Sequence, residues 1–138
     1  MLTKAALKQL ANARLGEAVT LLDARLYSGA YYLGGYSAEL GLKACIAASF
    51  LPDTIPDKRF VERIYTHDLR RLVELAGLEA DRFARVADDA TFAENWEYVQ
   101  GWSESARYAA TEEELARSLI DGLRDPDHGV FEWIKSHW

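Results

Sequence analysis

Two charged residues in this chain have the types and spacing of an ion pair within a helix. Glu39 and Lys43 stand four residues apart, so a helix places both on one face with the acid nearer its N-terminus. On an exposed face they form an ordinary ion pair. If other helices or a second subunit cover that face, they form an obligatory structural pair or a site for a ligand or partner. The sequence leaves both alternatives open.

His67 has the side chain best suited to proton transfer or anion binding. It precedes Asp68 at the start of a short expected helix, where the helix dipole favours a neutral imidazole that can accept a proton. Arg63 comes one helical turn earlier and can share a bound anion through its planar guanidinium. The alternative is that His67 only caps the helix or packs against its neighbours.

Aromatic residues and one arginine extend this candidate chemistry. Tyr32 and Tyr36 continue the stripe of Glu39 and can either stack on a base or fill the core. Arg107, beside Tyr108, can hold a phosphate or carboxylate, or it can anchor its loop by pairing with an acid such as Glu39. The candidate ligand-binding residues are Tyr36, Glu39, Lys43, His67, Arg107 and Tyr108, provided that the fold brings them together.

Two long N-terminal helices are expected to position the first of these residues. Apolar residues at spacings of three and four predict one helix over about residues 3–27, and a short break at Ser28-Gly29 predicts that a second helix folds back on it and runs to about Phe50. The second helix is apolar on most of its circumference, which predicts that it is the central one. One stripe of it holds small residues that allow close helix packing: Gly34, Ala38, Gly41, Cys45 and Ala48.

The rest of the chain also shows helical spacing. A short helix is expected after Thr66 and ends at Gly77, and a longer one is expected over about 79–100. After a loop over 101–110, a capping box at 111–114 opens another helix, and Asp125-Pro126 marks a restart near the C-terminus. The prediction is one all-α domain over residues 1–138, an antiparallel up-and-down bundle of four to six helices.

Composition narrows the classes of function. A net charge of −6 in 138 residues argues against a surface that grips nucleic acid by charge alone. The single Cys45 excludes an intramolecular disulfide and, with three dispersed histidines, gives no metal site; no cofactor is indicated. We see neither a signal peptide nor an apolar run long enough to cross a membrane, so a cytoplasmic protein without membrane contact is expected.

Three segments of the chain look familiar in their order and spacing. The first segment, residues 30–44, has an aromatic-rich start and ends in Glu39-x-x-x-Lys43-Ala44. The second segment is Thr66-His67-Asp68-Leu69-x-x-Leu72, and the third is an Arg107-Tyr108 loop before a long helix. In these features the chain resembles the HEPN family of small bacterial helical-bundle proteins. The resemblance covers roughly residues 5–135.

The resemblance implies a bundle that commonly forms homodimers and binds a nucleotide, RNA or a companion nucleotidyltransferase, often in a toxin–antitoxin-like system. Family members that are metal-independent ribonucleases use an arginine followed, after four to six residues, by a histidine. Here Arg63 and His67 leave only three residues between them, as do Arg124 and His128. The departure argues against nuclease activity.

Three hypotheses about function follow. The first is a non-catalytic binding or partner module of this family. The second is a ribonuclease with a non-standard pair, in which His67 is the base and Arg63 or Arg107 stabilises the phosphorane charge. The third is a structural scaffold for oligomer assembly.

Overall fold

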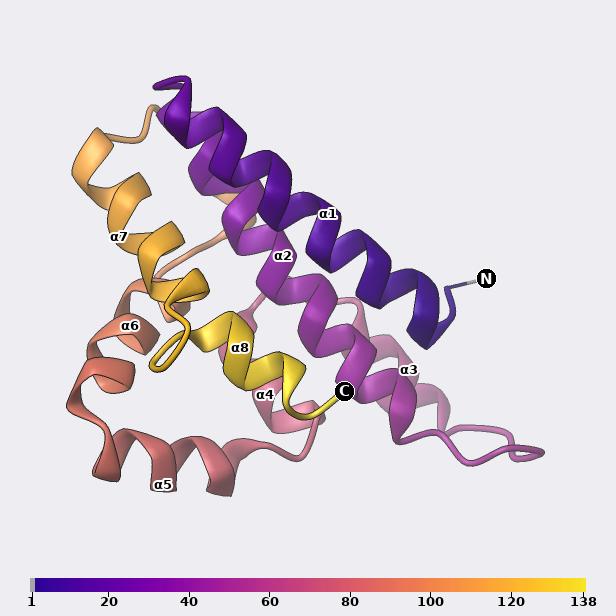
Figure 1. Cartoon of the computed structure of the whole chain (residues 1–138). Coiled ribbons are helices and arrows are strands. Elements are labelled where there is room, and N and C mark those ends of the chain that lie inside the picture. Colours follow the sequence, from indigo (N-terminus) through magenta and orange to yellow (C-terminus); the bar gives the residue numbers. More distant parts are fainter. Residues whose placement is uncertain (1) are drawn as a thin grey trace.

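Helices make up all the regular secondary structure in the computed structural model, which describes residues 2–138 (Figure 1). The all-α prediction is confirmed, although this part of the chain forms eight α-helices where four to six were expected. The elements are α1 (Lys4–Asp23), α2 (Tyr27–Ala48), α3 (Lys58–Ile64), α4 (Leu69–Leu75), α5 (Glu79–Asp88), α6 (Ala90–Gln100), the 3-10 helix η1 (Glu104–Tyr108), α7 (Glu113–Arg124) and α8 (Val130–Lys135).

Helices α1 and α2 form an antiparallel hairpin whose turn differs from the expected one. Arg25 adopts a left-handed backbone conformation with φ of 62°, and the reversal is complete by Leu26. Ser28 and Gly29 therefore lie in the first turn of α2, and the prediction that they break the chain was wrong. The reversal comes from one strained residue, because Arg25 supplies the positive φ that glycine usually provides.

Helix α2 is the central helix, as its apolar circumference predicted. It contacts α1, α4, α7, α8 and η1 (Figure 1). The stripe of small residues has the expected purpose, because Gly34 faces α7 and Gly41 faces α8. A Cβ atom on Gly41 would lie only 3.0 Å from Ile134 Cγ2, so a larger residue there would push the Ile134 side chain aside, and glycine lets α8 pack closely.

The expected helix over 79–100 is two helices, divided at Asp89. The backbone of Asp89 is extended, with φ −135° and ψ 96°, and its side chain accepts a hydrogen bond from the Phe92 backbone N–H at 2.9 Å. It thus ends α5 and caps α6. An aspartate cap also opens the unexpected helix α3, where Asp57 accepts from the Phe60 N–H at 3.0 Å.

Two predicted helix starts near the C-terminus were wrong. Helix α7 begins at Glu113 without a capping box, because Thr111 instead donates its backbone N–H to Ser28 Oγ at 2.9 Å. Helix α8 begins four residues beyond Pro126, after Gly129. Asp125 closes the intervening turn, accepting backbone hydrogen bonds from Asp127 and His128 at 2.9 Å each. The 101–110 segment, expected to be a loop, contains η1.

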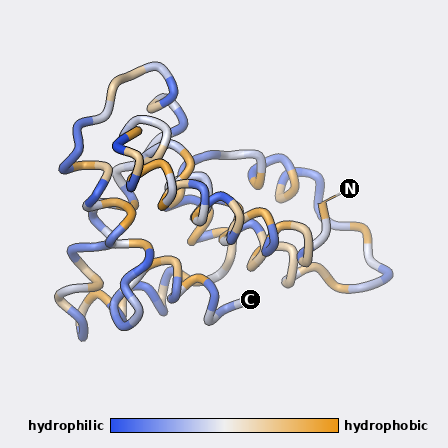
Figure 2. Tube along the Cα trace, turned by 45° about the horizontal axis from the view of Figure 1, so that its top comes forward, coloured by the Kyte–Doolittle hydropathy of each residue, from blue (hydrophilic) through white to orange (hydrophobic). Residues whose placement is uncertain are grey.

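Hydrophobic and hydrophilic positions alternate along the turns of the helices (Figure 2), as expected of helices with one buried face. The core includes Phe92, Phe131 and Ile134, and Cys45 is a free, buried thiol whose pKa burial raises to about 11. Across residues 2–138, no helix combines the length and the hydropathy that a membrane-spanning segment needs.

Candidate functional site

The Glu39 carboxylate lies at the centre of the candidate site and is almost completely buried, at 1% exposure. Lys43 Nζ, one turn further along α2, donates to its Oε1 at 2.8 Å. His67 Nδ1 lies 3.0 Å from both Oε1 and Oε2. A carboxylate this deeply buried needs such partners, because burying an unpaired charge is strongly destabilising. We call these three residues the Glu39 cluster.

The tautomer of His67 follows from this contact. Both atoms facing Nδ1 are acceptors, so Nδ1 carries a proton and donates it to the Glu39 carboxylate. The side chain is 38% exposed, and Nε2 has no hydrogen-bond partner within residues 2–138. His67 is therefore held on one side and open on the other, which is the arrangement of an imidazole prepared to bind or to exchange a proton.

Helix α4 fixes the position of His67. Leu69 and Leu72 are buried and attach α4 to the core, where it contacts α2. Asp68 caps α4 by accepting hydrogen bonds from the backbone N–H groups of Arg70 and Arg71. Since the cap directly follows His67, the imidazole has little freedom to leave Glu39.

An aromatic strip, made of Tyr32, Tyr36 and Trp102, borders the Glu39 cluster. The Tyr36 ring centre lies 6.3 Å from that of His67 and 6.2 Å from that of Trp102. Burial, with a further contribution from the charge of Glu39, raises the pKa of Tyr36. The Trp102 indole packs onto Gly35, where an added Cβ would come within 2.1 Å of the ring. Only glycine at this position allows the contact.

Arg107 does not join the Glu39 cluster. Its guanidinium lies 4.7 Å from the centre of the exposed Tyr108 ring, and hydrogen bonding to Tyr108 and Tyr32 raises its pKa. No ion pair of Arg107 is present in the described part of the chain. Of the four polar residues expected to converge, Glu39, Lys43 and His67 meet, while Arg107 stays near the Tyr32 end of the aromatic strip.

His67 and Arg63 line different pockets. The Arg63 guanidinium lies over the Phe60 ring at 5.7 Å and borders a pocket of about 510 Å³ between α3 and α4, shared with Arg71. His67 borders a second pocket of about 340 Å³, which we call the His67 pocket. Its lining comes from two chain segments: Thr66, His67, Asp68 and Arg70 from the first, and Gln100, Gly101, Trp102, Ser103 and Glu104 from the second.

Sequence reasoning missed three polar residues of this pocket. Arg70, Gln100 and Ser103 have ordinary positions in their helices and loops, and no spacing connects residue 70 with residue 100. Their convergence depends on α4 and α6 meeting in the fold, which they do beside α2. The aromatic residues were the nearest usable indication, since Trp102 belongs both to this pocket and to the aromatic strip that it forms with Tyr32 and Tyr36 of α2.

No family model matches the chain, and comparison with curated proteins and with solved structures gives no match either. The chemistry has therefore to be derived from the geometry. Within residues 2–138, no three side chains of the metal-ligating types gather into a metal site. What the site offers is hydrogen bonding and charge of both signs around one small pocket: an open imidazole nitrogen, a guanidinium, an amide and hydroxyls, with the carboxylates of Asp68 and Glu104 beside them.

Proposed function

We propose that this protein is a non-catalytic, HEPN-like binding module whose His67 pocket binds a nucleotide. The observation that carries the proposal is the placement of His67, whose Nδ1 is bound to the buried Glu39 while Nε2 has no partner within residues 2–138, in a pocket that Arg70 also lines. A ring fixed on one side presents its other nitrogen without losing side-chain entropy on binding, so its contribution to affinity is larger.

The composition of the pocket suits a mononucleotide. The Arg70 side chain is two-thirds exposed and can bind a phosphate through two parallel hydrogen bonds, with His67 Nε2 donating a third when protonated. The Gln100 amide and the Ser103 hydroxyl can bond to a ribose or to the edge of a base. A volume of about 340 Å³ lies at the small end of the range for ligand pockets, which favours a single nucleotide over a longer RNA.

The resemblance to the HEPN family supports the same class of ligand. The Glu39-x-x-x-Lys43 motif that resembles the family's lies on the central helix, and the Thr66-His67-Asp68-Leu69 segment that resembles the family's supplies His67. From this resemblance we also propose a homodimer and a companion nucleotidyltransferase, as in toxin–antitoxin-like systems.

Titration calorimetry with nucleoside mono-, di- and triphosphates tests the proposal on three proteins. We expect the wild type to bind one of these, Arg70→Gln to bind it about tenfold more weakly, and Arg71→Gln to bind it unchanged. Arg71 is the matched control, because it is equally exposed and also lies 3.9 Å from Asp68, yet it lines the other pocket. Absence of nucleotide binding, or equal loss in both variants, would contradict the proposal.

A ribonuclease is the second candidate, and the pairing of Glu39 with His67 is the observation that favours it. A carboxylate that orients an imidazole makes a competent general base. Cleavage also needs a group that stabilises the phosphorane charge; the expected Arg63 lines a different pocket, so in a ribonuclease Arg70 would have to take that role. RNA incubated with wild type and with His67→Gln should stay intact in both; cleavage by the wild type alone would establish the ribonuclease.

A further inference from the structure

A second feature lies away from the His67 pocket, at the end of the bundle where α2 finishes. An apolar groove of about 520 Å³ runs between the first residues of α1, the last turn of α2 and α3. Its walls include Phe50, Val61, Ile64 and Tyr65. The loop over 49–57, which joins α2 to α3, projects from the molecule beside it (Figure 1).

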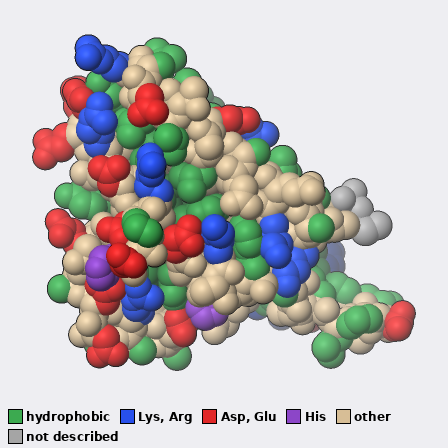
Figure 3. All heavy atoms as spheres, in the orientation of Figure 1, with side chains coloured by type: hydrophobic (Ala, Val, Ile, Leu, Met, Phe, Trp, Pro, Cys, Tyr) green, Lys and Arg blue, Asp and Glu red, His purple; other side chains and the backbone are tan. Residues whose placement is uncertain are grey.

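This end of the molecule exposes an unusual amount of apolar surface. Half of the ten large hydrophobic residues that are exposed within the described chain belong to it. Ile55 is 98% exposed and Tyr65 is 80% exposed, and hydrophobic side chains follow the projecting loop in Figure 3. The other members are Leu2, Phe50 and Leu51. Contiguous exposed apolar surface of this kind, bordering a groove, marks an interaction site.

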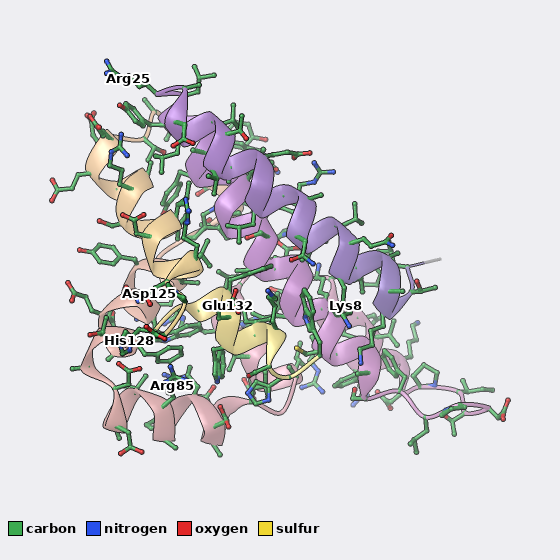
Figure 4. All side chains as sticks on the ribbon, viewed as in Figure 1. Lys8, Arg25, Arg85, Asp125, His128 and Glu132 are labelled. Atoms are coloured by element: carbon green, nitrogen blue, oxygen red, sulfur yellow. The ribbon has the colours of Figure 1, made fainter. Side chains whose placement is uncertain are left out.

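The charge around the groove is opposite to that of the rest of the protein. Residues 2–8 and 43–65 contain six basic and three acidic side chains, a net charge of +3 in a chain of −6, so the remaining residues carry −9. Lys58 on α3 is almost fully exposed, whereas Lys43, which lines the groove itself, is paired with Glu39. Figure 4 places Lys8 on the same end of α1. An apolar groove with a basic border is complementary to an acidic, amphipathic partner.

We propose that this groove binds an amphipathic helix of a partner protein, with apolar residues at i, i+3, i+4 and i+7 facing the groove and acidic residues on its flanks. Helices that dock in grooves use this spacing of anchors, and the basic border supplies the attraction to the flanks. The proposal does not rest on the proposed nucleotide site, since the groove and the His67 pocket have no lining residue in common.

Two other occupants fit the surface less well. A symmetric dimer through this end would place two groups of net charge +3 against each other, and like charges at an interface are repulsive. A lipid bilayer would meet Asp53 first, because this charged residue stands between Leu51 and Ile55 on the projecting loop. Burying an aspartate in lipid is unfavourable.

Fluorescence anisotropy with designed peptides tests the proposal on the full chain. The probe is a labelled helix with leucines at the four anchor positions and glutamates elsewhere. Two controls accompany it: a peptide of the same composition with the leucines scrambled, and one with lysine in place of glutamate. We expect only the first to bind, and its affinity to fall as salt screens the basic border.

Substitutions then locate the binding surface. Tyr65→Ser and Lys58→Glu should each lower the affinity for the acidic peptide by about tenfold. Phe83→Ser and Arg124→Glu are matched controls on exposed residues outside the groove, and they should leave the affinity unchanged. Circular dichroism verifies that every variant is folded.

Several results would overturn the proposal. These are binding of the scrambled peptide with the same affinity as the designed one, the same loss of affinity in the control variants as in the groove variants, or absence of binding to any of the peptides. Vesicles of anionic lipid and light scattering test the other two occupants. If the peptide fails to bind and the wild type sediments with the vesicles but Tyr65→Ser does not, the occupant is lipid. If the peptide fails to bind and the wild type forms a dimer that Tyr65→Ser does not form, the occupant is a second copy of the chain.

Discussion

Three carboxylate–imidazole pairs form within residues 2–138, and two of them, of similar geometry, have opposite surroundings. In the Glu39 cluster, His67 meets a carboxylate that is buried inside the bundle. At the other pair, His128 Nδ1 lies 2.8 Å from Asp89 Oδ2 at a partly exposed junction. The same two functional groups thus serve different purposes. Burial makes the first pair a requirement of the fold that holds its imidazole in place, and exposure makes the second pair sensitive to pH.

The exposed pair joins two parts of the chain. Asp89 separates α5 from α6, and His128 lies in the turn between α7 and α8. Arg85 reinforces the junction by donating to Asp89 at 3.1 Å and to the backbone carbonyl of Asp127 at 2.8 Å. Figure 4 shows Arg85, Asp125 and His128 gathered there. We call Arg85, Asp89, Asp125 and His128 the elbow cluster.

Removing the buried acid should have the largest effect. Glu39→Ala leaves the ammonium of Lys43 without its carboxylate in a mostly buried position, so we expect a loss of about 3–5 kcal/mol in the free energy of unfolding. Urea denaturation followed by circular dichroism measures it. The double variant Glu39→Ala/Lys43→Met should recover part of that loss. A cost for Glu39→Ala no larger than that for Asp89→Ala would show that burial does not separate the two pairs.

Adding one methyl group beside the buried region should have a smaller effect. Gly35→Ala would bring a Cβ within 2.1 Å of the Trp102 indole, so the ring must move and we expect a loss of about 1–3 kcal/mol. Gly16→Ala is the matched control in a helix, because nothing lies within 4 Å of its Cβ position; it should stabilise the protein by about 0.5–1 kcal/mol. Thermal unfolding of both variants tests this, and equal midpoints would contradict it.

The elbow cluster should give the smallest effect, and this effect should depend on pH. Hydrogen bonding to Asp89 raises the pKa of His128, and hydrogen bonding to His128 is the largest cause that lowers the pKa of Asp89 to about 2. The raised pKa of His128 means that its contribution to stability is complete below about pH 6.5 and is lost as the pH rises through the folded-state value. The contribution of Asp89 is lost only as the pH falls towards 2.

Melting temperatures at about pH 6 and about pH 9 test this assignment. The wild type should lose more stability between these values than His128→Gln or Asp89→Asn, because either substitution removes the pair. The double variant should behave like the single ones. A pH dependence that persists in His128→Gln would mean that another group is responsible.

The two pairs also differ in how far the sequence foretold them. Glu39 and Lys43 lie at helical spacing on a helix of clear periodicity, so their pairing follows from local geometry. Asp89 and His128 are 39 residues apart, and nothing local connects them. The same limit explains why one helix was expected over 79–100. The hydrogen bond by which Asp89 caps α6 competes with continuation of the α5 helix, and the partners of Asp89 in the elbow cluster favour the cap.

Contacts between distant residues account for the other differences. Thr111 has the sequence context of a capping residue, but its N–H bonds to Ser28 in the first turn of α2. Gly35 lies outside the predicted stripe of small residues, and its close neighbour, Trp102, could not be named from the sequence. The all-α class and the central position of α2 were predictable because they depend on hydrophobic periodicity, which each segment carries in itself.

Lys43 has a consequence that extends beyond the pair it forms with Glu39. It lines the apolar groove, and through Glu39 it is two hydrogen bonds from the imidazole that borders the His67 pocket. If the proposed acidic partner draws Lys43 towards the groove, His67 becomes the remaining partner of the buried carboxylate, and the contact that orients the imidazole changes. The two binding equilibria are then linked, and linkage is reciprocal: the factor by which the partner changes nucleotide affinity equals the factor by which the nucleotide changes partner affinity.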